Sequence, residues 1–295
     1  MANTLGTLAG DLIAQKALDY LTETYPLLSL IANDVSEGQA LYNQTVVTRI
    51  NSVPAAKAFD PTVGYAADPA VSTDVSVTLD KHIYSSVEFS EQELSSTNIN
   101  LIDDFAQSLS YSIGDSVMGD IGTLLGNATT YTNESVATIA LFDRVTGVLN
   151  PRGALAARKV NNGLVEVLTP QAETALWSDD SIVSLNYNRT GGISAQVLPE
   201  IHGVKISRMD SLPSGLNAVV LSKDAVIFCS RTPQIETSNP AGEIRNVSNE
   251  QGLSIQYRRW HDMKRGVVQL AFTVMYGVAA GNPTCAQRVV ETATP

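Results

Sequence analysis

Few residues in this sequence could bind a metal or hold a disulfide framework. Its histidines, His82, His202 and His261, belong to no H-x-x-x-H or H-E-x-x-H motif, and its two cysteines, Cys229 and Cys285, form no Cys-x-x-Cys pair. Zinc sites are usually built on such spacings, so none is predicted. Two cysteines are also too few to form a disulfide framework that stabilises a chain of 295 residues. We expect neither a metal nor a cofactor.

The motifs of common enzyme families are missing as well. No G-x-x-x-x-G-K-S/T, G-x-G-x-x-G or G-x-S-x-G pattern occurs. The sequence therefore predicts neither of the usual phosphate-binding loops and no nucleophile elbow of the hydrolase type. Serine, histidine and aspartate occur in almost any chain of this size, so their presence does not indicate a catalytic triad. We therefore do not expect an enzyme.

Positive charge is scarce too. The chain has 19 basic and 30 acidic residues, a net charge of −11, which argues against a protein that covers nucleic acid with a basic face. No run of eighteen apolar residues is present, so no membrane-spanning helix is predicted. The first 21 residues lack the basic start and apolar core of a signal peptide. With 44% hydrophobic residues, the chain can form a substantial core.

The N-terminal segment has the spacing of an amphipathic helix. Its apolar residues recur at intervals of one to four and form one stripe: Leu5, Leu8, Leu12, Ile13, Ala17 and Leu21. Pro26 ends the pattern. Such a stripe needs a surface to pack on, either the core of the same chain or a neighbouring subunit.

A period of two follows between residues 45 and 89. Val75, Val77, Leu79, Ile83, Val87 and Phe89 all occupy odd positions, which predicts strands. The polar stretch 51–72 between the two strand patterns contains Pro54, Pro61, Gly64 and Pro69 and few large apolar residues. This composition favours an extended two-stranded loop that projects from the body, rather than a compact sheet.

The strongest helix pattern covers residues 98–126. Ile102, Phe105, Leu109, Ile113, Val117, Ile121 and Leu124 form one stripe of about six turns. Gly114, Gly119 and Gly122 weaken a helix, so we expect another part of the backbone to pack closely on them. The pattern also indicates a second helix at 134–149, and strands at 165–168, 193–198, 204–207, 218–221, 226–229, 253–257 and 267–276. The fold class is α+β.

The cluster Arg258-Arg259-Trp260-His261, followed by Lys264 and Arg265, is the only basic site. It could contact nucleic acid, but in an acidic chain an intersubunit salt bridge or a solvated loop is favoured. Cys229, within Ala225-Val226-Ile227-Phe228-Cys229, is interpreted as a small buried residue.

The order of these elements resembles a known family. The strand pair ends in Val-Thr-Leu-Asp-Lys-His-Ile-Tyr-Ser-Ser-Val-Glu-Phe-Ser (77–90) and runs into the long helix with Ile102-Asp103-Asp104-Phe105. Further along the chain are Gly203-Val204-Lys205-Ile206, Leu212-Pro213 and Tyr276-Gly277-Val278. Together these segments resemble the major capsid proteins of tailed double-stranded DNA phages, which have the Hong Kong 97-type fold.

The resemblance implies a division of the chain. Residues 1–44 would be an N-terminal arm, 45–76 an extended β-hairpin loop, and 77–164 a peripheral domain with its spine helix at about 98–126. Residues 165–262 would form a mixed axial domain, and 263–295 the strands that return to the peripheral domain. Seven residues on these segments are candidate subunit-interface positions: Leu8, Leu12, Arg49, Lys57, Asp60, Arg258 and Arg259.

The function implied is a structural one. Such a protein self-assembles through pentameric and hexameric capsomers into an icosahedral or prolate shell, which encloses DNA without sequence-specific binding. It would assemble in the host cytoplasm and reside in the virion. Its expected partners are itself, a portal protein, a decoration protein and, because the sequence begins at Met1 without a long scaffolding segment, a separate scaffolding protein. The alternatives are an encapsulin-like nanocompartment shell and a minor phage structural protein of low oligomeric order.

Overall fold

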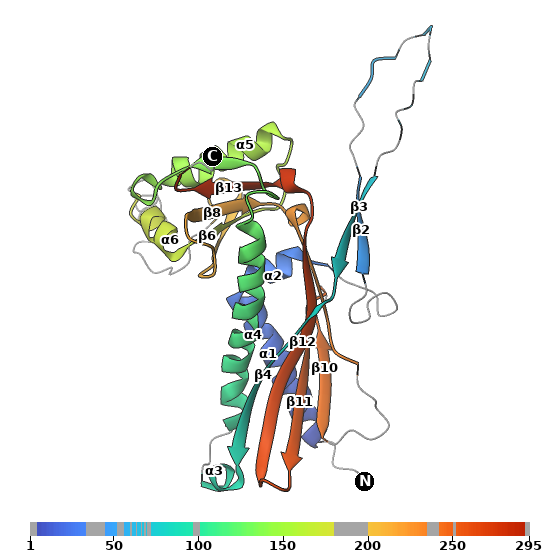
Figure 1. Ribbon diagram of the computed structural model, residues 1–295, viewed down its shortest axis with the longest axis vertical. Coiled ribbons are helices and arrows are strands. Elements are labelled where there is room, and N and C mark those ends of the chain that lie inside the picture. Colours follow the sequence, from blue (N-terminus) through green and yellow to red (C-terminus); the bar gives the residue numbers. More distant parts are fainter. Residues whose placement is uncertain are drawn as a thin grey trace.

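The computed structural model describes residues 5–33, 45–51, 56–59, 61–62, 64–65, 67, 69, 72–96, 101–179, 200–234, 242–249 and 252–292. Figure 1 shows an elongated molecule in which a sheet and two helices run along the long axis, while a second sheet with shorter helices lies at one end. We call the first part the long body and the second part the end unit.

The long body is built on a six-stranded sheet. Its order is β1-β9-β12-β11-β10, and β4 pairs with the other edge of β12. Only β1 and β9 pair in parallel. The bounds are β1 Ala32–Asn33, β4 Lys81–Ser90, β9 Val226–Arg231, β10 Glu243–Ser248, β11 Ser254–Asp262 and β12 Val267–Ala280. Because β12 is fourteen residues long, its first half lies between β4 and β11, and its second half pairs with β9.

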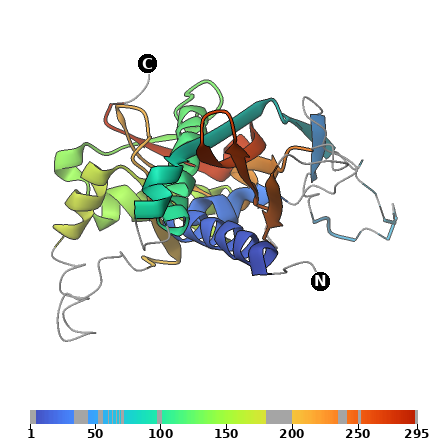
Figure 2. The same ribbon diagram turned by 90° about the horizontal axis from the view of Figure 1, so that it is seen from below.

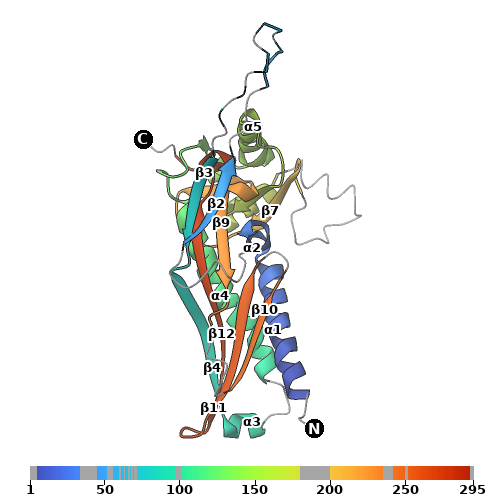
Figure 3. The ribbon, with the colours of Figure 1, turned by 90° about the vertical axis from the view of Figure 1, so that its right-hand side faces the viewer.

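Two helices cover one face of this sheet. Helix α1 (Leu5–Thr24) packs on α4 (Leu101–Leu125) and on β10 and β11 (Figure 3). The predicted stripe of α4 is buried at Leu109, Ile113, Val117 and Ile121. Phe105, in the same stripe, is 40% exposed and meets the ring of Phe89 edge-on, with centroids 5.3 Å apart. Short helices α2 (Pro26–Ile31) and α3 (Glu91–Ser96) complete the long body.

The end unit contains a five-stranded sheet of order β5-β13-β8-β6-β7. Its strands are β5 Glu134–Val136, β6 Leu164–Leu168, β7 Val204–Arg208, β8 Leu216–Leu221 and β13 Ala286–Val290. Helices α5 (Asn150–Ala157) and α6 (Pro170–Trp177) contribute Leu155, Ala172 and Leu176 to the apolar cluster on one face of this sheet. Short 3-10 turns occur at Ile139–Leu141, Lys223–Ala225 and Pro283–Cys285.

Residues 134–149 do not form the predicted helix. The segment starts as β5, which pairs in parallel with β13, then makes a 3-10 turn and a π-helical stretch, η2, at Arg144–Leu149 that leads into α5. The Asp143 carboxylate accepts the backbone amides of Val145 and Thr146 and so caps η2. Pairing with a strand about 150 residues away therefore overrides the local apolar spacing.

Strand pairing also crosses the boundary that we predicted between residues 262 and 263. Strands β10 and β11 lie before this point, yet they pair with β12, which lies after it. Strand β13 lies after it and pairs with β8 in the end unit. The boundary therefore falls inside one sheet, because strands join by hydrogen bonding without regard to their order in the chain.

The two parts of the molecule meet at the C-terminal half of α4. A Cβ atom on Gly122 would lie 2.4 Å from the backbone oxygen of Ser211. A Cβ atom on Gly126 would lie equally close to the Pro213 ring. Arg288 on β13 donates to the Gly126 carbonyl at the end of α4 and pairs with Glu134 on β5. Gly114 is covered by side chains, the Tyr25 ring and Leu21, and Gly119 has no described neighbour within 4 Å, so the predicted close packing of backbone is found at Gly122 and is wrong at the other two glycines.

Within the described part of the chain, no helix has both the length and the hydropathy that a membrane crossing requires.

Candidate subunit interface

The two-stranded ribbon formed by β2 (Thr45–Asn51) and β3 (Ser72–Thr78) stands away from the body (Figure 1). Val47 on β2 is 54% exposed. Beyond the strands, Phe59 is 62% and Tyr65 95% exposed, and their ring centroids lie 5.1 Å apart. An exposed aromatic pair on a projecting element is typical of residues that fill a pocket on a partner.

The base of this ribbon is firmly held. Val77 is fully buried and packs against Ile227 and Cys229 on β9. A Cβ at Gly277 on β12 would lie 2.2 Å from the Thr78 carbonyl oxygen, so only glycine allows the chain to cross β12 this closely. The C-terminal end of β3 is therefore anchored to β9 and β12.

Helix α1 presents a second exposed surface. Its inner side is buried through Ala14, Ala17, Leu18 and Leu21. On the outer side, Leu12 is 54% exposed. The neighbouring Asp11 carboxylate lies 3.0 Å from Nε of Arg245 on β10 and ties α1 to the sheet. The helix therefore packs on its own chain and still leaves apolar surface uncovered.

The third surface is the sheet face opposite the helices. Tyr84 on β4 is 72% exposed there. It borders a shallow groove lined by Tyr84, Ser86, Val87, Glu88, Trp260 and Gln269. Arg265 Nη1 lies 2.9 Å from Glu88 Oε2 beside the groove. Two large aromatic side chains at an open groove could accommodate an apolar segment of a partner.

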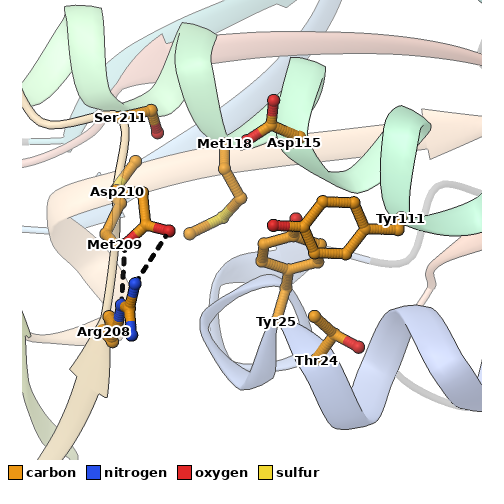
Figure 4. A pocket seen from close by; sticks show the side chains of 9 residues that line it. All are labelled: Thr24, Tyr25, Tyr111, Asp115, Met118, Arg208, Met209, Asp210 and Ser211. Atoms are coloured by element: carbon orange, nitrogen blue, oxygen red, sulfur yellow. Dashed lines mark hydrogen bonds and ion pairs between the residues drawn. The ribbon is translucent and has the colours of Figure 1, made fainter.

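A pocket lies where α1, α4 and the connection after β7 meet (Figure 4). The rings of Tyr25 and Tyr111 are tilted by 35° with centroids 5.8 Å apart, and Arg208 pairs with Asp210 at 2.7 Å. Burial raises the pKa of the Tyr25 hydroxyl. No group of three His, Cys, Asp or Glu among the described residues could hold a metal ion.

Comparisons with known proteins give matches among solved structures. No protein-family model and no curated protein matches the sequence. The capsid of Ralstonia phage GP4 matches with a TM-score of 0.60 at 10% identity, over 90% of this chain and 89% of that chain. The capsid of the cyanophage P-SCSP1u gives 0.59 at 9%, over 90% and 87%. The mature capsid of bacteriophage PhiM1 gives 0.53 at 13%, over 89% and 88%.

The chain has the fold of tailed-phage capsid proteins. The resemblance drawn from the sequence is confirmed at the level of the fold, because the matches cover most of both chains. At 9–13% identity they give the arrangement of elements and not the role of any residue.

The candidate interface residues do not gather into one site on this capsid-type fold. Leu8 and Leu12 lie on α1, Arg49 on β2, and Lys57 is exposed beyond β2. The side chains of Leu8 and Arg49, and all of Asp60, lie outside the described residues. The distribution over the helix, the ribbon and the sheet would suit several contacts with different neighbours.

Arg258 and Arg259 point to opposite faces of β11, because successive residues of a strand alternate. Arg258 donates from Nε to Gln256 Oε1 at 2.6 Å, and burial lowers its pKa. Arg259 is exposed. Neither forms an ion pair with a carboxylate of the described chain. Their role in an interface stays a prediction, and the pair cannot act as one basic patch.

The sequence-based list missed the aromatic residues. Phe59 and Tyr65 could have been identified as interface candidates, since they are the aromatic side chains of a largely polar stretch that was predicted to project. Tyr84 carried a signal as well, since it occupies an even position of β4, opposite the apolar Ile83 and Val87 that were predicted to share one face. Met263, which is 87% exposed at the turn between β11 and β12, carried no pattern at all.

Proposed function

We propose that this chain is a major capsid protein that self-assembles into a closed shell around the double-stranded DNA of a phage. The fold carries the proposal, because a capsid-type fold extends over about nine-tenths of the chain. The projecting ribbon with Phe59 and Tyr65 supports it, since an isolated subunit leaves these rings in water. The net charge of −11 also suits a wall that must not adhere to packed phosphates.

In this role the long body would be the peripheral domain, the end unit the axial domain near the capsomer centre, and the β2–β3 ribbon the extended loop. This assignment revises the boundaries predicted from the sequence, because β10 and β11 belong with β12, and β13 with β8. The proposal also includes pentameric and hexameric capsomers, a separate scaffolding protein, a portal protein and a decoration protein as partners, and the virion as the location.

The ribbon is the proposed contact between neighbouring copies. Heterologous contacts between unlike surfaces can close into rings and shells. A rigid base at Val77 and an aromatic pair beyond it provide one such surface, and the groove between Tyr84 and Trp260 provides an unlike surface that a neighbour could present. We place the aromatic rings of one copy against this sheet face of another.

The test is assembly of the purified chain with a candidate scaffolding protein from the same phage genome, followed by sedimentation and electron microscopy. We expect closed hollow particles from the unchanged chain and from the conservative variant F59Y/Y65F. The variant F59S/Y65S should give soluble, folded subunits that do not close. Normal shells from F59S/Y65S would contradict the role of the ribbon, and rings of three or six copies that never close would contradict the shell itself. Native particles that hold an enzyme and no DNA would indicate the nanocompartment.

A further inference from the structure

The sheet of the end unit buries a carboxyl group for which the described part of the chain provides no partner. Glu166 lies in the middle of β6, a strand bordered on both sides by β7 and β8. The residue is 0% exposed, and neither carboxyl oxygen has a hydrogen-bond partner among the described residues. A buried carboxylate without a partner is strongly unfavourable, so this arrangement calls for an explanation.

The surroundings of Glu166 are apolar. In the sheet it lies beside Val220 on β8 and Ile206 on β7. Leu164 and Leu168, two positions away along β6, join the cluster that includes Leu155 of α5, Leu176 of α6 and Val148 of η2. Helices therefore cover this face, and burial alone raises the pKa of Glu166 well above its usual value.

Cations on the covering elements are directed elsewhere. Arg158, which follows α5, donates to Gln287, two strands from Glu166 in the same row. Arg208 pairs with Asp210 at 2.7 Å and lies 4.0 Å from Glu173 of α6. Arg144 contacts His202 at 3.2 Å. Two acids on these elements have other partners: Asp143 caps η2, and Asp179 accepts a hydrogen bond from the Arg144 backbone amide. Lys205 lies beside Val165, on the opposite face of the sheet from Glu166. The remaining charged residues are Arg152 on α5 and Lys159 after it.

We propose that Glu166 makes the end unit a pH-sensitive element of the fold: the unit is held together while the carboxyl is protonated and is loosened when it ionises. The direction follows from proton linkage. The folded state keeps the proton to higher pH than the unfolded state, whose carboxyl titrates near 4.5. Stability is therefore highest below the unfolded value and falls as pH rises through the folded one.

The experiment compares the pH dependence of unfolding by urea in the full-length, unassembled chain. One proton of difference changes the unfolding equilibrium constant up to tenfold per pH unit. We expect this dependence between pH 5 and 8 to be steeper in the unchanged chain than in Glu166→Gln, which mimics the protonated acid. Glu173→Gln, a change to a partly exposed acid on α6, is the matched control and should keep the original slope.

Because an amide at position 166 could itself prevent folding, Glu166→Met is a second neutral variant, and it should show the same flattened slope. Hydrogen exchange, corrected for the intrinsic effect of pH, should show lower protection of β6 and β8 at pH 8 than at pH 5 in the unchanged chain only. An identical slope in the unchanged chain and both neutral variants would overturn the proposal. So would protection of β6 and β8 that does not depend on pH.

Discussion

Tyr276 on β12 donates a hydrogen bond to the Asp120 carboxylate on α4, and this bond links the sheet of the long body to the helix that covers it. Lys81, the first residue of β4, lies with Nζ 2.7 Å from the other oxygen of Asp120 and 5.9 Å from the centroid of the Tyr276 ring. Burial, with a contribution from Asp120, raises the pKa of Tyr276. The hydroxyl therefore remains a donor throughout the neutral range.

Removing this hydroxyl should destabilise the chain. We expect Tyr276→Phe to lower the free energy of unfolding by about 1.5 kcal/mol, the usual contribution of a hydrogen bond to a charged group. Urea unfolding monitored by circular dichroism measures the change. Tyr84→Phe is the control, because that ring is 72% exposed and its hydroxyl can bond to water in both states. Equal stability of Tyr276→Phe and the unchanged chain would show that the link contributes nothing.

Two glycines of α4 should respond in opposite directions to the same substitution. Gly119 faces open space, so Gly119→Ala should raise the free energy of unfolding by about 0.5–1 kcal/mol through helix propensity. Gly122→Ala should lower it, because the added methyl group would lie 2.4 Å from the Ser211 carbonyl oxygen at the junction with the end unit. The difference between the melting temperatures of Gly119→Ala and Gly122→Ala measures the destabilisation caused by the contact with Ser211. A stabilising Gly122→Ala would show that the backbone at the junction moves aside without cost.

The thiol of Cys229 should be inert in the folded chain. It is buried beneath Val77 at the base of the ribbon, and burial raises its pKa to about 11. Since only the thiolate reacts, alkylation at pH 8 should be slowed on the order of a hundredfold by the shift alone. Mass spectrometry of peptides after timed iodoacetamide labelling gives the rate.

Loosening the ribbon provides the matched comparison for this thiol. Val77→Ala removes part of the cover over Cys229 and should increase its labelling rate, while Val136→Ala, at an exposed position of β5, should not. Fast labelling of Cys229 in the unchanged chain would mean that the base of the ribbon opens readily.

Local patterns in the sequence predicted the elements whose stabilisation is local. The apolar stripe between 98 and 126 corresponds to α4 at Leu101–Leu125, and the alternation between 45 and 89 corresponds to β2, β3 and β4. Helical and strand periodicities repeat within a few residues, so a single sequence contains them in full. The polar stretch with Phe59 and Tyr65 also indicated a projecting loop, because it lacks the apolar residues for a core.

Contacts between distant parts of the chain decided the rest. The segment 134–149 forms β5, which pairs with β13, in place of the predicted helix, and the predicted boundary at residue 262 falls within one sheet because β11 pairs with β12. Neither pairing leaves a local trace, since backbone hydrogen bonds carry no sequence signal of their own. The capsid-type order of elements was thus determined by the sequence itself. The alternation along β4 also left Tyr84 on the exposed face, but the burial of Glu166 was decided only by the helices that tertiary packing lays against the sheet of the end unit.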